Sequence, residues 1–437
     1  MQSVRFLNLT DQDVLCCSSS DTIALPPELS QLVILPPRCS YVLLNSSKEP
    51  GPDSVKTKPG SWKLKISLAL GASWQAVKVP SDCQWRIYGT RPVGGLHQFT
   101  IFPKRNLASF LSEMPDATPL YSLLLPGTHD TMAFYGWIIS QCQSIETPLN
   151  VQLHNGIRVL DIRLAVIEGG LIAYHGLYPQ KTPFQTILST VYAFLRSPAS
   201  CRETIVMSVK QEDYSTTPQT LFSRLVREEF MNGLGGSLNM LFLENRVPKL
   251  GEVRGKVILL SRFGGNGAEW ENGLEGLGIH PTTWPDSKKD GFTWQCKNVH
   301  VRTHDWYAIP SFLYIPEKVS LATEFLISPD DVRPTLSIVY TSASSFPWAA
   351  PKTIAQGFGW PKWGLGVEGV NSRVGRWILD ALSSTSGDTV EATKQNLSLS
   401  EPRLRGWVLM DFYDRPEHAL VELLVECNFR GRQPEEG

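Results

Sequence analysis

The strongest constraint on the fold is a series of short apolar segments that begins near Asn106 and alternates with helical stretches. Segments that are apolar throughout are typical of strands buried on both faces, as in a parallel barrel. Seven of them stand out: residues 121–125, 158–163, 204–210, 256–262, 298–302, 336–342 and 406–411. This alternation predicts an α/β fold, an irregular TIM-type (β/α) barrel over residues 105–437. The eighth strand of the barrel cannot be located from the pattern.

Helical periodicity is clear in four stretches, residues 186–196, 217–231, 317–327 and 417–428. Residues 263–299 differ, because they are rich in Gly and Trp and show no helical period. We therefore expect the barrel to be imperfect in that region.

Residues 1–104 have another pattern, in which short alternating or apolar runs are separated by turn-forming clusters. Such spacing predicts an all-β, sandwich-like N-terminal domain, whose role the sequence does not indicate. The candidate strands are residues 4–9, 31–35, 40–44, 62–70, 74–79, 84–88 and 98–102. The expected organisation is thus two domains, 1–104 and 105–437.

Composition bears on partners and location. The net charge of −1 over 437 residues gives no basic field, so nucleic acid is not an expected partner. We find no run of 18 apolar residues and no signal-peptide core at the N-terminus. The expected location is cytoplasmic or peripheral on membranes, with secretion after processing left open. Eight cysteines without a CxxC pair offer no zinc spacing, and free thiols are favoured over disulfides, which an exported form could still contain.

Polar side chains follow five of the predicted strands at their C-terminal ends. In a (β/α) barrel these ends converge on one face, where catalytic groups gather. A single polar residue there would usually be a solvated strand end, but five strands in agreement predict a site. The residues are His129 and Asp130, Asp161 and Arg163, Lys210, Arg262, and Asp411.

At these positions the sequence resembles the X-domain family of phosphatidylinositol-specific phospholipase C, most closely its bacterial, metal-independent branch. The resemblance covers about residues 106–428 and leaves out the N-terminal third. Residues 106–120 look like the helix that closes the barrel before its first strand. The matching segments are LPGTHDT (125–131), NGIRVLDIR (155–163), AYHGLY (173–178), ETIVMSVKQE (203–212), RGKVILLSRF (254–263), HDWY (304–307), TSASS (341–345) and GWVLMDF (406–412).

The resemblance implies cleavage of a phosphodiester by attack of the inositol 2-hydroxyl. That reaction needs a base, an acid for the departing oxygen and a cation for the phosphoryl oxygens. His129 is the candidate base, with Asp411 as its hydrogen-bond partner, and His175 is the candidate acid, supported by Asp130. Gly169 and Gly170 lie between two apolar arms, which predicts a hairpin that brings His175 back beside Arg163.

Arg163 decides the question of a metal. Calcium-dependent relatives hold the ion with a carboxylate cluster, but here a guanidinium occupies the family's ligand position. It can bind phosphate through two parallel N–H groups. Asp161 could orient that guanidinium or simply pair with it. The expected site therefore needs no metal and no other cofactor.

Recognition of the headgroup is expected from the same rim. The resemblance implies that Lys210, Arg262 and Asp305 bind the inositol hydroxyls and that Tyr307 stacks on the ring. Simpler roles stay open, since Lys210 could pair with Glu212 and Tyr307 could belong to the core.

The substrate would lie in a bilayer, so the rim should carry apolar side chains. Aromatic rings without helical or strand periodicity follow the barrel's later strands, and such rings favour the headgroup region. A small core packed within a long loop is the alternative. The candidates are Trp137, Phe346, Trp348, Phe358, Trp360 and Trp363.

Three further interpretations stay open. The lipid could be phosphatidylinositol, a glycosyl-phosphatidylinositol anchor or an inositol phosphosphingolipid. A magnesium-dependent glycerophosphodiesterase or sphingomyelinase D on a similar barrel would need a carboxylate cluster, against which Arg163 and His175 argue. A catalytically silent lipid-binding module is disfavoured because every expected catalytic residue is present. The expected partners are a phosphoinositide-type lipid and the membrane surface; the oligomeric state is left open.

Overall fold

The computed structural model describes residues 3–17, 32–35, 40–44, 73–90, 97–232, 238–264, 277–329, 333–345, 347–361, 365–383, 402–416 and 419–432. These residues form two compact units. The first unit holds those of Met1–Arg105, Trp360–Leu365 and Ile378–Glu401. The second holds those of Asn106–Gly359, Gly366–Trp377 and Pro402–Gly437.

The described part of the first unit contains a five-stranded sheet in the order β4-β1-β7-β6-β5 and a separate β2-β3 pair. Strands β1 and β7 are parallel, whereas the other neighbours are antiparallel. The apolar core of the unit is Val14, Val77, Ile87, Phe99 and Ile101. The expected strand at residues 62–70 lies outside the described residues, and a complete sandwich stays a prediction. The strands are β1 (Ser3–Asn8), β2 (Val14–Cys17), β3 (Leu32–Leu35), β4 (Ser40–Leu44), β5 (Trp74–Ala76), β6 (Trp85–Thr90) and β7 (His97–Pro103).

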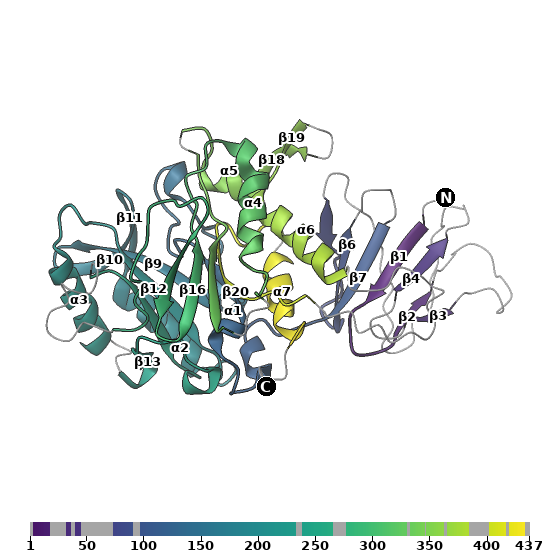
Figure 1. The fold of residues 1–437 in the computed structure, drawn as a ribbon, viewed down its shortest axis with the longest axis horizontal. Helices are drawn as coiled ribbons and strands as arrows, with labels where there is room; N and C mark the ends of the chain where they lie inside the picture. Colours follow the sequence, from purple (N-terminus) through teal and green to yellow (C-terminus); the bar gives the residue numbers. More distant parts are fainter. Residues whose placement is uncertain are drawn as a thin grey trace. The chain divides into compact units, whose positions relative to one another are not determined.

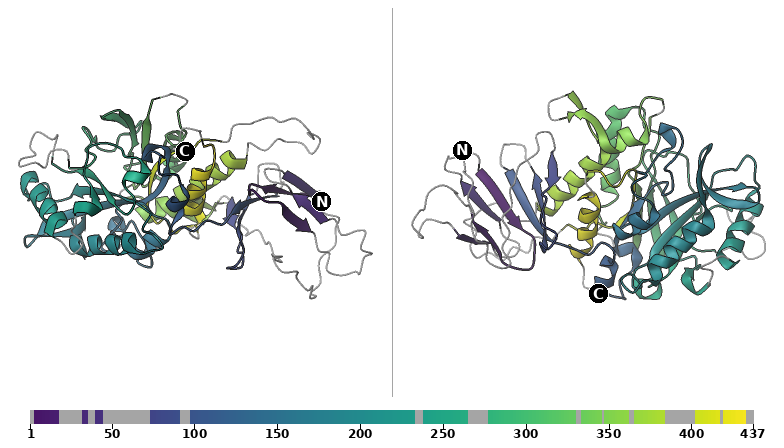
Figure 2. Two further views of the ribbon diagram at one scale, coloured as in Figure 1. Left: turned by 90° about the horizontal axis from the view of Figure 1, so that it is seen from below. Right: turned by 180° about the vertical axis from the view of Figure 1, so that it is seen from behind.

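The second unit is built on one strongly curled sheet in the order β13-β14-β12-β9-β8-β20-β17-β16-β15 (Figures 1 and 2). All neighbours in this path are parallel except β15 and β16. The mixed α/β fold with a barrel-like sheet is therefore as expected. The strands are β8 (Leu124–Thr128), β9 (Val159–Ile167), β12 (Ile205–Gln211), β13 (Leu241–Phe242), β14 (Val257–Arg262), β15 (Phe292–Cys296), β16 (Val299–His304), β17 (Thr335–Tyr340) and β20 (Gly406–Met410).

Two strands of this path were not located from the sequence, β13 and β15, and β13 adds two residues in parallel to β14. Beyond it, the region expected to be irregular supplies the antiparallel strand β15 and a single parallel bridge from Ile279 to Leu260. Along the described strand path β13 and β15 are not hydrogen-bonded to each other, so the barrel is incomplete on this side.

The start of the second unit differs from two expectations. Residues 106–120 form no α-helix but a 3-10 turn, Phe110–Glu113, because Pro115 removes a donor and forces Met114 to be extended. A second 3-10 turn at Leu120–Ser122 follows Pro119, so the first strand begins only at Leu124, later than predicted.

Helices connect the strands and lie along the outside of the curled sheet (Figure 2). Helix α2 illustrates why, since it buries one face made of Phe184, Ile187, Leu188, Val191 and Leu195. No helix in the part of the chain that is described is both long and apolar enough to cross a membrane. The helices are α1 (Leu149–His154), α2 (Phe184–Arg196), α3 (Gln219–Asn232), α4 (Ile315–Glu324), α5 (Pro351–Gln356), α6 (Val370–Ser383) and α7 (Ala419–Glu426).

A hairpin extends from barrel strand β9, and a separate pair of strands follows α5. The predicted hairpin is confirmed: β9 turns at Glu168 and Gly169, both with positive φ, and pairs antiparallel with β10 (Gly170–His175). Strand β11 (Tyr178–Pro183) continues this ribbon. A separate two-stranded sheet consists of β18 (Gly357–Trp360) and β19 (Leu365–Glu368), between α5 and α6.

Candidate active site

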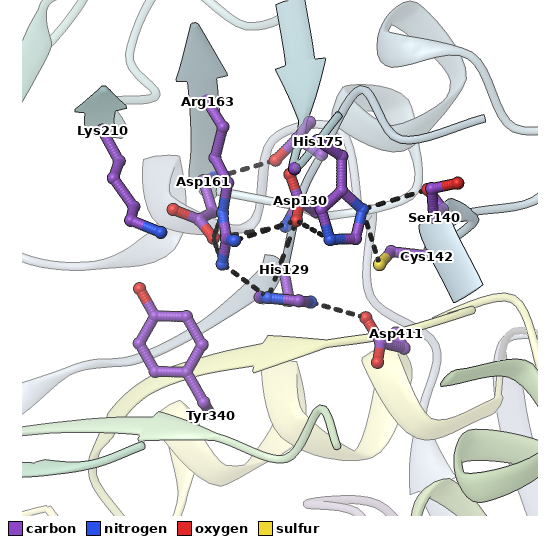
Figure 3. A network of polar contacts seen from close by, with 12 residues as sticks. His129, Asp130, Ser140, Cys142, Asp161, Arg163, His175, Lys210, Tyr340 and Asp411 are labelled. Atoms are coloured by element: carbon purple, nitrogen blue, oxygen red, sulfur yellow. Dashed lines mark hydrogen bonds and ion pairs between the residues drawn. The ribbon is translucent and has the colours of Figure 1, made fainter. Parts of the chain in front are cut away.

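Neighbouring parallel strands deliver the polar residues to one end of the sheet, as Figure 3 shows. Lys210 is in register with Arg163 on one side and with Arg262 on the other. His129 and Asp130 follow β8, and Asp411 follows β20, which lies beside β8. The convergence predicted from the strand ends is confirmed for these residues.

The turn after β8 has a shape that its sequence dictates. A side chain at Gly127 would lie 2.7 Å from Cβ of Val159, so only glycine lets β8 approach β9. Asp130 has a positive φ of 44°, which turns the chain sharply after His129. The backbone N–H of His129 donates to Met410, and that of Thr131 donates to Asp161. The turn is therefore anchored to the strands on both sides.

His129 is held between an acid and a guanidinium. Its Nδ1 lies 2.8 Å from Oδ1 of Asp411, and its Nε2 lies 2.7 Å from Nη2 of Arg163. Because a guanidinium can only donate, Nε2 must carry a lone pair and Nδ1 must carry the proton. Burial and the charge of Arg163 hold the pKa of His129 well below its usual value. His129 is thus a neutral imidazole with its basic nitrogen directed at Arg163.

His175 is held by the chain that follows the turn. Its Nδ1 donates to the carbonyl oxygen of Ser140 at 3.0 Å and lies 3.8 Å from Sγ of Cys142. Its Nε2 lies 3.4 Å from Oδ2 of Asp130. Burial raises the pKa of Asp130 to about 6, although Arg163 and the charged form of His175 oppose the shift. Asp130 therefore holds a proton more readily than an exposed aspartate does.

Arg163 stands at the centre of three carboxylates. Its Nη1 lies 3.2 Å from Oδ2 of Asp130 and 3.3 Å from Oε1 of Glu212, and its Nη2 lies 3.3 Å from Oδ2 of Asp161. Burial opposes ionisation of Asp161, but the charges of Arg163 and Arg262 outweigh it and lower its pKa. Asp161 therefore serves both as a partner and as an orienting group for Arg163.

The four residues expected to bind inositol lie at this end of the sheet with partners of their own. Lys210 Nζ donates to Oε1 of Glu212 at 2.9 Å, so the simple pairing considered above occurs. Arg262 lies 3.5 Å from Oδ1 of Asp161, and Asp305 accepts a 2.9 Å bond from Nε1 of Trp284. Tyr307 is 38% exposed and its hydroxyl donates to Asp286. Its ring is therefore not part of the core.

Sequence reasoning missed two residues that shape the site, and it named a third, Glu212, only as a possible partner of Lys210. Tyr340, at the end of β17, places its ring edge-on to His129 with centroids 5.9 Å apart and accepts from Nη1 of Arg262 at 2.9 Å. Trp284 stacks under the guanidinium of Arg262 at 3.8 Å. Glu212 binds both Arg163 and Lys210. Tyr340 ends an apolar run as the other site residues do, which was a usable signal, whereas Trp284 lies in a loop without periodicity.

One group within the described residues has the spacing of a metal site: potential ligand atoms of His129, Asp130 and Cys142 lie within 4.8 Å of one another. It offers a single carboxylate, whereas calcium prefers about six to eight oxygen ligands. The guanidinium of Arg163 also contacts His129 and Asp130, so positive charge already fills the position. These residues do not fit a calcium ion.

Four of the six proposed rim aromatics lie among the described residues and all are exposed. Trp137 is 64% exposed, Trp348 76%, Phe358 44% and Trp360 67%. Phe346 and Trp363 lie outside the described residues. Leu177, in the turn directly after His175, is 87% exposed and was not predicted. These side chains do not form a small core within a loop.

Comparison with known proteins connects this site to one family. Residues 127–263 match the family model of phosphatidylinositol-specific phospholipase C, X domain. A 1-phosphatidylinositol phosphodiesterase of Listeria monocytogenes is 32% identical over 164 residues, which is 35% of this chain and 48% of that protein. Its namesake from Staphylococcus aureus is 27% identical over 188 residues, 41% of this chain and 57% of that one. The chain spans about half the length of the curated relatives it matches.

Solved structures extend the likeness of the fold. The phosphatidylinositol-specific phospholipase C of Listeria monocytogenes superposes with a TM-score of 0.52 at 22% identity, covering 74% of this chain and 99% of that one. The corresponding Staphylococcus aureus structure, described for its membrane binding, gives 0.54 at 20% identity, with 74% and 98% covered. The resemblance to this family that the motifs indicate is therefore confirmed.

Proposed function

We propose that the chain is a phosphatidylinositol-specific phospholipase C that cleaves the inositol phosphodiester without a metal ion. The observation that carries this proposal is the central position of Arg163, which contacts His129 on one side and Asp130, the partner of His175, on the other. A phosphate bound at Arg163 would have a base and an acid within reach. The bacterial relatives named 1-phosphatidylinositol phosphodiesterase support the same reaction.

The first half of the reaction uses His129. The 2-hydroxyl of the inositol attacks phosphorus, and Nε2 of His129 takes the hydroxyl proton. Asp411 accepts from Nδ1 and stabilises the imidazolium that forms. Because Nη2 of Arg163 contacts Nε2, the guanidinium would have to turn its donors to the phosphate oxygens before the base could act. Substrate binding would thereby free the base.

The second half uses the pair of His175 and Asp130. The bond between phosphorus and the glycerol oxygen breaks, and the leaving oxygen receives the proton held between Nε2 and Oδ2. The products are a diacylglycerol and inositol 1,2-cyclic phosphate. An intramolecular nucleophile is favoured because its orientation is already fixed within the substrate.

Inositol recognition falls to Lys210, Arg262, Asp305 and Tyr307. The support is their position at the same end of the sheet, with charged groups and one exposed aromatic ring. Charged donors and acceptors suit ring hydroxyls, and an exposed ring suits the ring face. The ammonium of Lys210 donates to Glu212, so it would need to donate to this carboxylate and to the substrate at the same time.

The membrane surface is the proposed partner. Exposed indoles such as Trp137 and Trp348 can enter the headgroup region, where amphipathic rings are favoured. Leu177 adds an exposed apolar side chain two residues after His175. We assign the chain a peripheral rather than a spanning attachment.

Residues 1–104 would form an all-β domain that aids docking and supplies no catalytic group. Every residue in the proposed chemistry belongs to residues 105–437, which supports this division. A chain that begins at Asn106 should keep its activity on a soluble substrate. Loss of that activity in a folded truncated chain would assign the N-terminal residues to the site.

The lipid could instead be a glycosyl-phosphatidylinositol or an inositol phosphosphingolipid, since both offer the same cyclising hydroxyl. Incubation with each lipid, with and without EDTA, distinguishes them when the products are followed by phosphorus NMR. Cleavage of phosphatidylinositol in EDTA is the expected result. A metal requirement would favour the magnesium-dependent phosphodiesterases, and binding without turnover would indicate a silent lipid-binding module.

A further inference from the structure

Lys318 is a buried cation whose ammonium donates to two backbone carbonyls. It lies in α4 with no exposed surface, on the face that also buries Ile315, Val319 and Ala322. Its Nζ donates to the carbonyl oxygen of Trp306 at 2.8 Å and to that of Tyr340 at 2.6 Å. A lysine at such a position in an amphipathic helix is unusual, because burying an ammonium is costly.

The two carbonyls belong to segments that carry site residues. Trp306 lies between Asp305 and Tyr307, two of the residues assigned to inositol. Tyr340 ends β17, packs edge-on to His129 and accepts from Arg262. One ammonium therefore ties the end of β17 to the segment that follows β16.

The charge of Lys318 also acts on site carboxylates. Burial raises the pKa of Asp411 well above its usual value, and the charge of Lys318 opposes that shift. Burial lowers the pKa of His304, and the charge of Lys318 lowers it further. Burial lowers the pKa of Lys318 to about 7, and the charges of Asp305 and Asp411 oppose that shift. Lys318 is therefore charged in acidic solution, where its charge partly offsets the effect of burial on Asp411.

We propose that Lys318 is a positioning residue for the reaction, which holds the inositol-binding segment against Tyr340 and places a positive charge near Asp411, the partner of His129. It touches no reacting atom and acts through these neighbours. This inference rests on the proposed function and adds to it a group outside the family's motif segments. It also explains why an ammonium occupies a place where an apolar side chain would cost less.

The test is Lys318→Met in the full chain, which keeps the length of the side chain and removes its charge and donors. Two effects are expected with a short-chain soluble phosphatidylinositol. KM rises about tenfold as the inositol-binding segment loosens. The acidic limb of the kcat/KM profile moves to higher pH by about one unit, because a carboxylate that loses a nearby cation is protonated more readily.

The other groups that act on Asp411, by charge or by hydrogen bond, are unchanged in this variant. They are His129, Asp130, Cys142 and Arg163. Lys318→Arg keeps the charge, so its acidic limb should stay at the wild-type pH even if KM rises. Lys318→Gln, which keeps a donor without the charge, replaces Lys318→Met if the latter does not fold.

Arg405→Met is the matched control. Arg405 is also a buried cation that donates to backbone carbonyls, those of Cys427 and Arg430, but it precedes β20 at the end opposite Asp411. We expect it to lower thermal stability without moving KM or the acidic limb.

A folded Lys318→Met or Lys318→Gln enzyme with wild-type KM and an unmoved limb would overturn the proposal. Equal changes of KM and of the acidic limb in Arg405→Met would overturn it too, since the effect would then be general destabilisation. An inactive wild type in the same assay would instead contradict the proposed function.

Discussion

Nη2 of Arg163 lies 2.7 Å from Nε2 of His129, so the proposed phosphate-binding cation is bound to the proposed base. Arg163 also contacts the carboxylates of Asp130, Asp161 and Glu212. Its charge, together with burial, keeps the imidazole of His129 neutral. The contact with Nε2 makes the base available only after the guanidinium has found another acceptor. In the proposed mechanism, substrate binding and activation of the base would thereby be coupled.

Replacing Arg163 should be among the most damaging changes in the site. Arg163→Ala removes a donor pair to the transition-state phosphoryl group, and loss of one such electrostatic donor costs on the order of 10²–10³ in rate. Lys should restore little, because an ammonium lacks the planar fork of donors. Turnover of a soluble substrate by each variant is the measurement; a Lys variant with near wild-type turnover would contradict the role.

Replacing Arg163 by Asp asks a different question. A carboxylate beside Asp130 and Asp161 would add hard oxygen ligands, so calcium should partly restore the activity of Arg163→Asp. The comparison is the same variant in EDTA, with Arg163→Ala as a control that gains no ligand. Equal responses of both variants to calcium would argue that the three acids do not surround the phosphate site.

The acidic limb of the wild-type profile should lie below the pKa of an ordinary histidine. Burial and Arg163 lower the pKa of His129, and a base is active only when it is unprotonated. As pH falls, activity should therefore persist below about 6.5, the usual histidine value. The profile of kcat/KM on a soluble substrate checks this. An acidic limb centred above pH 6.5 would contradict the lowered pKa of His129.

Membrane action should depend on exposed indoles. Trp348→Ala combined with Trp360→Ala should weaken cleavage of phosphatidylinositol in vesicles and spare a short-chain soluble substrate, because each ring can bury apolar area in the interface. The matched control is the double change to Phe, which keeps aromatic area and should keep most of the vesicle activity. Equal losses on both substrates would point to a packing role instead.

Stability should report the burial of Lys318 independently of catalysis. The pKa of Lys318 is lowered from 10.5 to about 7 by burial, so between those pH values the unfolded chain holds a proton that the folded chain does not. This group therefore makes the free energy of unfolding increase as pH rises through that window. Urea unfolding at pH 7 and pH 9 should show a smaller increase in Lys318→Met than in the wild type. Identical increases would contradict the buried titration.

The residues that the sequence could predict are those tied to strand direction. Parallel strands bring their C-terminal ends together, so His129, Arg163, Lys210 and Asp411 could be grouped from the positions of the apolar segments alone. The hairpin that returns His175 followed from Gly169 and Gly170 in the same way. Local chain geometry was sufficient in both cases.

Other features depend on tertiary packing and could not be predicted from the sequence pattern. Pro115 and Pro119 break the expected opening helix and delay the first strand to Leu124, an effect that apolar periodicity alone does not show. The bond of Asp305 to Trp284 joins a strand end to a loop without periodicity. Lys318 belongs to an otherwise regular amphipathic helix, so its buried contacts follow only from the position of α4 against the strand ends.

The central claim is that Arg163, and not a metal ion, meets the phosphate. It is tested most directly with the wild-type chain and phosphatidylinositol in EDTA, followed by phosphorus NMR from the earliest times. We predict full activity in EDTA, no gain on adding calcium, and inositol 1,2-cyclic phosphate as the first product. Activity that EDTA abolishes and calcium restores would contradict the metal-free mechanism.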